Sequence, residues 1–116
     1  MSILVKPGSI QRRDSAVSTV GFRKVTGILT ESRFFRLRKA IRVHEYEDDG
    51  VWIHECKPLG IFAFAEDRLE SWQTFVEFFE CNWDSVAQER DSKLTLDAQE
   101  LKRKYLEIVE SVDRIL

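Results

Sequence analysis

The segment between Phe34 and Tyr46 constrains the fold most strongly, because apolar residues alternate in it with basic ones. The odd positions hold the apolar residues Phe35, Leu37, Ile41 and Val43, and the even positions hold Arg36, Arg38 and Arg42. A period of two is typical of a half-buried β-strand, since successive side chains point to opposite faces. We therefore predict a strand with one face in the core and one basic face.

A turn signal follows this strand directly. Asp48-Asp49-Gly50 fits the loop of a hairpin, because Gly50 tolerates the positive φ that such a loop requires. A three-residue loop places Tyr46 opposite Trp52. It also places His44 opposite His54, whereas a two-residue loop shifts every pair by one position. We favour the three-residue register.

Further strands flank this hairpin. Residues 21–29 are rich in Val, Ile, Phe and Thr and predict a strand before it, with a turn at residues 30–32. Val51 begins the return strand, which Pro58-Leu59-Gly60 breaks, and residues 61–65 predict one more short strand. Together these segments predict an antiparallel β-meander of three to four strands.

Two amphipathic helices are expected after the meander. Asp67 followed three residues later by Glu70 is a capping box, which marks the start of the first helix. Apolar residues then recur at spacings of three and four, which predicts a core position for Trp72, Phe79 and Trp83. Leu69 and Phe78 belong to the same stripe, and a second stripe runs from Asp97 to Leu116.

These elements predict an α+β fold in which the meander packs against the two helices. At 116 residues the chain is long enough for one core and too short for two. Residues 1–20 lack any sustained period and are expected to form a flexible arm, so that residues 21–116 make a single domain. No apolar run has the length of a membrane span, and we expect a cytoplasmic protein without membrane contact.

The net charge of -2 hides a strong asymmetry along the chain. Residues 1–42 carry ten Lys or Arg and two acids, whereas residues 43–116 carry eight Lys or Arg and eighteen acids. The basic strand face of Arg36, Arg38 and Arg42 is then either an ordinary solvated surface or a contact for nucleic acid or an acidic partner. These three arginines are the candidate contact residues.

The sequence supports no metal, cofactor or catalytic site. His44 and His54, with Cys56 on the same face in the favoured register, make at most three ligands, so we expect a metal-free protein. Single glycines do not form a phosphate-binding loop. Acids cluster around the hairpin at Glu45, Glu47, Asp48, Asp49 and Glu55, and we interpret them as solvated residues in a protein that is not an enzyme. The two cysteines, Cys56 and Cys81, are expected to be reduced and buried.

The run from Asp48 to Gly60, the short strand after it and the segment Asp67-Arg68-Leu69-Glu70-Ser71-Trp72 resemble the HicB-like antitoxin domain. The likeness covers about residues 40–85. It implies a three-stranded sheet against a helix that binds and blocks a small ribonuclease toxin of bacteria. The family usually has Gly and a capping Thr where this chain has Ala65-Glu66-Asp67, so Asp67 takes over the capping.

Three functions follow as hypotheses. The first is a non-enzymatic, antitoxin-like module that binds another protein, such as a small basic toxin, or a second copy of itself. The second is nucleic-acid binding through the basic strand and arm, and the third is an enzyme that uses the acidic hairpin.

Overall fold

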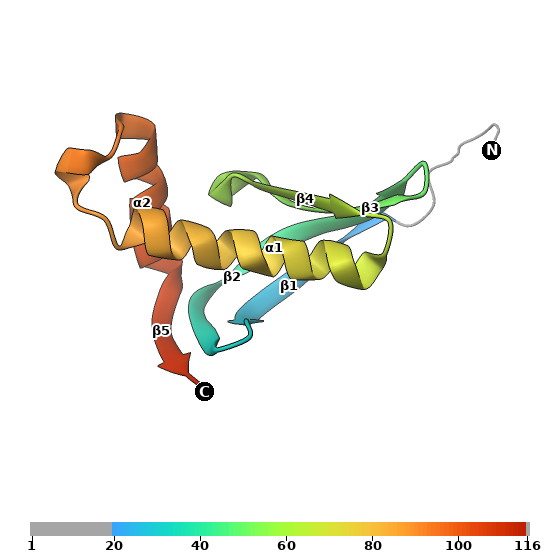
Figure 1. The fold of residues 1–116 in the computed structure, drawn as a ribbon, viewed down its shortest axis with the longest axis horizontal. Coiled ribbons are helices and arrows are strands. Elements are labelled where there is room, and N and C mark those ends of the chain that lie inside the picture. The colour runs from blue at the N-terminus through green and yellow to red at the C-terminus, as the bar shows by residue number, and fades with distance from the viewer. Residues whose placement is uncertain (1–19, 116) are drawn as a thin grey trace.

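The computed structural model describes residues 20–115, which form five strands and two helices (Figure 1). In chain order these elements are β1 Val20–Leu29, β2 Arg33–Asp48, β3 Val51–Cys56, β4 Ile61–Ala65, α1 Arg68–Asn82, α2 Leu96–Ile108 and β5 Val109–Arg114. The predicted arm, residues 1–20, lies outside the described part of the chain except for Val20, where β1 begins.

All five described strands belong to one antiparallel sheet. β1, β2, β3 and β4 are neighbours in sequence order, and β5 pairs with the first part of β2. α1 lies lengthwise along one face of the sheet, and α2 lies at the end far from the β2–β3 hairpin (Figure 1). The predicted α+β class, a meander packed against two helices, is confirmed.

The β2–β3 turn contains two residues, so the three-residue register is wrong. Asp48 pairs with Val51, and only Asp49 and Gly50 lie between them. These two residues have φ angles of 54° and 80°. Two consecutive positive φ angles are typical of a type I′ turn, whose twist matches that of the flanking strands. The twist of the hairpin therefore favours the shorter loop.

α1 begins where the capping box predicts. Asp67 Oδ1 accepts hydrogen bonds from the backbone N–H groups of Leu69, at 2.7 Å, and Glu70, at 3.4 Å. These are two of the N–H groups that have no partner within the helix, so the carboxylate stabilises its first turn.

The face of α1 that packs on the sheet is narrower than predicted. Phe79 is fully buried as expected, whereas Trp72 and Trp83 are partly buried at the margin of the core. Leu69 and Phe78 are exposed. A helix that touches a sheet on one side buries a stripe about 100° wide, and these two residues lie outside it.

The second helix is shorter than predicted. α2 ends at Ile108, and the chain continues as β5, which pairs with residues 33–37 of β2. Apolar residues at 109 and 112 share a face of a helix, as predicted, and they share a face of β5 only because the pairing with β2 shifts register between Arg36 and Leu37. The free edge of β2 offers unpaired N–H and C=O groups to this segment, which favours the strand.

Gly27 lies where β1 passes under the ring of Phe34. A Cβ atom at Gly27 would lie 2.6 Å from the ring Cζ atom. We expect Gly27→Ala to destabilise the protein by about 1 kcal/mol, because the ring has to move. In a Phe34→Ala background the same change should cost less. Urea unfolding of the four proteins measures this coupling, and equal costs in both backgrounds would contradict it.

Candidate binding surface

The face of the sheet opposite α1 is not covered by any element of the part that the structure describes. We define the uncovered face by five aromatic residues of β1, β2 and β4: Phe22, His44, Tyr46, Phe62 and Phe64. The exposed fractions of Phe22, Phe62 and Phe64 are 56%, 49% and 62%. Large apolar side chains gathered on one face of a protein commonly mark an interaction site.

Contacts between neighbouring rings hold these side chains in place without covering them. Phe22 stacks on His44 with ring centroids 4.6 Å apart, and the His44 ring lies 4.4 Å from that of Tyr46. The centroids of Phe62 and Phe64 are 6.0 Å apart. A surface that is already ordered loses less conformational entropy when a partner binds.

The three candidate arginines are exposed but do not form one straight row. Val25 pairs with Ile41, whereas Gly27 pairs with Arg36, so residues 37–40 of β2 have no partner in β1. This irregularity separates Arg36 from Arg42, although the predicted alternation of buried odd and exposed even positions is kept on both sides of it. An evenly spaced row of phosphate contacts is therefore not present on this strand.

Each of these arginines has a neighbour within the chain. The guanidinium of Arg36 lies 5.6 Å from the ring centroid of Phe34, and that of Arg42 lies 4.2 Å from the ring centroid of Phe22. Arg38 donates a hydrogen bond of 2.8 Å to the backbone oxygen of Glu107. Cation–π contacts leave a guanidinium its charge, so Arg36 and Arg42 still offer positive charge to a partner.

Part of the charge asymmetry of the sequence is compensated by ion pairs inside the chain. Pairs with N···O separations of 2.7 to 3.5 Å join the basic first part to the acidic second part: Arg33 with Glu80 and Asp84, Lys39 with Glu107, and Arg23 with Glu45. Such pairs reduce the positive potential available to an anionic partner.

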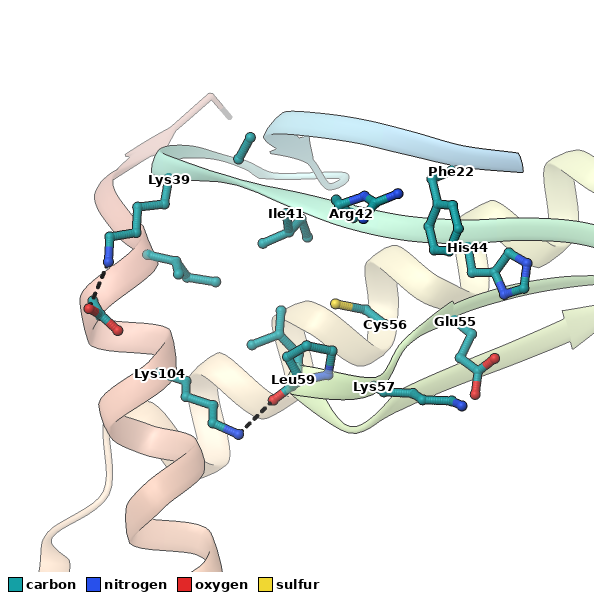
Figure 2. A pocket seen from close by; sticks show the side chains of 14 residues that line it. Phe22, Lys39, Ile41, Arg42, His44, Glu55, Cys56, Lys57, Leu59 and Lys104 are labelled. Atoms are coloured by element: carbon teal, nitrogen blue, oxygen red, sulfur yellow. Dashed lines mark hydrogen bonds and ion pairs between the residues drawn. The ribbon is translucent and has the colours of Figure 1, made fainter. Parts of the chain in front are cut away.

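A pocket of about 570 Å³ opens at one end of the uncovered face, where β2 and β3 separate (Figure 2). Their pairing ends at His44 and Glu55, and β3 then continues into the short helical turn Lys57–Leu59. Ile41 of β2 and Cys56 of β3 lie on either side of the gap, above α1 (Figure 2). α2 closes the pocket at one end.

A buried chain of hydrogen bonds links α1 to β3 and β2 on the face of the sheet that α1 covers. Ser71 Oγ lies 2.8 Å from His54 Nδ1, and His54 Nε2 lies 2.7 Å from Glu45 Oε2. Arg68 donates to both carboxylate oxygens of Glu45, at 2.7 and 3.2 Å. Ser71 and His54 have no exposed surface. A nucleophile has to touch its substrate, so we assign this chain a structural role, the attachment of α1 to the sheet.

The surroundings of His54 favour its neutral form. Burial lowers the pKa of His54, and the nearby guanidinium groups of Arg23 and Arg68 lower it further, against the opposing effect of Glu45. Burial alone would raise the pKa of Glu45, but hydrogen bonds from Arg68 and His54 bring it below its usual value. Neutral His54 thus donates a hydrogen bond from Nε2 to Glu45, and its Nδ1 accepts a hydrogen bond from the hydroxyl group of Ser71.

This chain of hydrogen bonds predicts that the protein loses stability in mild acid. Below about pH 6.5, the usual pKa of histidine, the unfolded state binds a proton that His54 resists in the folded state. The stability that His54 contributes is fully present above that pH and is lost as the pH falls. Because the pKa of Glu45 lies below its ordinary value of 4.5, stability falls a second time when the pH drops below 4.5. Urea unfolding at about pH 7.5 and about pH 5.5 measures the slope, which His54→Gln should flatten. Equal stability of the parent at both values would contradict this.

The hairpin register predicted from the sequence does not bring His54 and Glu45 of this hydrogen-bond chain together. It placed His54 opposite His44, whereas the two-residue turn pairs His54 with Glu45. His54 and Cys56 therefore face α1, and His44 lies on the uncovered face, so the three potential metal ligands are not together. No group of three His, Cys, Asp or Glu suited to a metal ion occurs within residues 20–115. Absence of metal in the protein itself stays a prediction for elemental analysis.

Two smaller expectations also change. The hairpin acids do not form one cluster, because Glu45 points toward α1 while Asp48 and Asp49 are exposed at the turn. Of the two cysteines, which are both free, Cys56 is buried as predicted but Cys81 is exposed.

Comparisons of this chain with protein-family models, with curated proteins and with solved structures find no match. Neither helix of the described part is long and apolar enough to cross a membrane.

Proposed function

We propose that the protein is a non-enzymatic interaction module whose uncovered face binds another protein. The observation that carries this proposal is the exposure of Phe22, Phe62 and Phe64 on a face that no described element covers. Aromatic residues are enriched in the buried centres of protein interfaces, where a few of them supply most of the binding energy. The three rings, with Tyr46 between them, offer such a centre.

The charges of this face favour a protein over a nucleic acid. Arg42 beside Phe22 is positive, but the carboxylates of Glu55 and Asp48 lie near Tyr46, where they raise its pKa after the larger effect of burial, and they give this part of the face a negative potential. Phosphate groups are repelled by such a potential, whereas basic side chains of a protein partner are attracted.

The resemblance to the HicB-like antitoxin domain suggests the kind of partner. A small basic ribonuclease toxin would place apolar groups on the exposed rings and basic groups near Glu55 and the hairpin acids. On this proposal the chain neutralises the toxin by covering it, and performs no chemistry of its own.

The test is co-expression with the products of neighbouring reading frames, followed by size-exclusion chromatography with light scattering. We expect a complex with the parent chain that is lost in the double variant Phe62→Ser/Phe64→Ser. The matched control is Leu69→Ser/Leu106→Ser, which changes two equally exposed apolar residues on the helices and should leave the complex intact. A complex that survives the β4 variant and is lost in the helix control would refute the proposal.

Nucleic-acid binding is the alternative function, and it needs a separate measurement. Fluorescence anisotropy with single-stranded RNA and DNA, from low to moderate salt, measures it. Salt-dependent binding that is lost when Arg36, Arg38 and Arg42 are all changed to Gln, without any protein complex, would replace the proposed function by the alternative.

A further inference from the structure

The pocket between β2 and β3 has an uncharged, apolar floor. Ile41 and Leu59 contribute aliphatic side chains, and Cys56 contributes its sulfur (Figure 2). Ile108 of α2 lines the pocket as well. Burial raises the pKa of the Cys56 thiol, so it stays protonated and adds no charge. The volume lies within the range of about 300 to 1,000 Å³ that is common for small-molecule sites.

The rim of the pocket is basic. Lys39, Arg42, Lys57 and Lys104 surround it, against the carboxylates of Glu55 and Glu107. Glu107 is bound to Lys39 at 2.8 Å, and Lys104 donates to the backbone oxygen of Pro58 at 3.2 Å. These contacts fix both lysines on the α2 side (Figure 2).

Two cations of the rim keep their charge available. Arg42 and Lys57 form no ion pair with any residue of the described part, and they lie on the two segments that flank the gap. Stacking on Phe22 holds the Arg42 guanidinium near the opening. An apolar cavity beside two free cations is complementary to a ligand with an apolar body and an anionic head.

We infer that this pocket binds an amphiphilic organic anion, a carboxylate that carries an aliphatic body of medium length. The aliphatic body replaces water over Ile41, Leu59 and Ile108, and the carboxylate meets Arg42 and Lys57. The inference does not rest on the proposed function, because the pocket is complete within one chain.

Decanoate is a suitable probe, with decanol and decyltrimethylammonium as neutral and cationic controls. Binding is followed by NMR through the methyl groups of Ile41, Leu59 and Ile108. We expect decanoate to bind saturably with a dissociation constant at or below about 1 mM. Decanol should bind about three- to tenfold more weakly. Arg42→Gln/Lys57→Gln should remove this preference and leave the affinity for decanol unchanged.

The control variant Lys93→Gln/Arg103→Gln removes the same charge from exposed positions outside the pocket and should keep the preference. Three results would each overturn the inference: equal affinity for the three probes, a preference that survives in Arg42→Gln/Lys57→Gln, or shifts confined to residues outside the pocket. Circular dichroism of each variant establishes that it is folded.

Discussion

Phe79→Ala is expected to lower the free energy of unfolding by about 3 to 5 kcal/mol. The ring is fully buried and lies between the sheet and α2, with its centroid 5.3 Å from that of Phe35 and 5.1 Å from that of Tyr105. Truncation removes the contacts of this ring with Phe35 and Tyr105 and leaves a cavity that rigid strands cannot fill. Urea unfolding followed by circular dichroism measures the loss.

Phe78→Ala is the matched control for this prediction. Phe78 is the same residue type on the same helix, but 44% of it is exposed. Its truncation removes little buried surface and should cost less than about 1 kcal/mol. Similar losses for the two variants would mean that α1 packs on the sheet with a different face.

Glu45→Ala is expected to cost about 2 to 3 kcal/mol, because the carboxylate accepts charge-assisted hydrogen bonds from His54 and Arg68. Its removal leaves the Nε2–H group of His54 buried without an acceptor, which is more costly than the loss of an exposed ion pair. The same unfolding measurement applies. Glu45 opposes the lowering of the His54 pKa, so the acid sensitivity that His54 causes should persist in this variant.

Glu66→Ala provides the comparison for Glu45, because Glu66 is an exposed acid shortly before α1. Its removal should change stability by less than about 0.5 kcal/mol. A Glu45 variant as stable as the Glu66 variant would contradict the structural role of the buried hydrogen-bond chain.

Local patterns of the sequence predicted the strands and the start of α1 because their causes are local. Alternation between Phe35 and Val43 and the capping Asp67 act within a few residues. The hairpin register depended instead on strand twist, and β5 depended on the free edge of β2, which only the assembled sheet provides. The helical spacing of residues 97–116 carries no information about that edge.

The candidate site was less accessible from the sequence than the fold. The basic residues Arg36, Arg38 and Arg42 were visible as a pattern, but their neighbours Phe22, Phe34 and Glu107 come from other segments. Exposure of Phe62 and Phe64 follows from the position of α1 on the other face of β4. A count of apolar residues would place both rings in the core.

Site-specific photo-cross-linking tests the central claim, that the uncovered face is the binding surface, most directly. A photoreactive phenylalanine derivative is introduced at Phe64, on that face, or at Phe78, an exposed residue of α1. Both proteins are irradiated in cells that also express the neighbouring reading frames, and adducts are identified by mass spectrometry. We predict a discrete protein adduct from position 64 and none from position 78; an adduct from position 78 alone would contradict the claim.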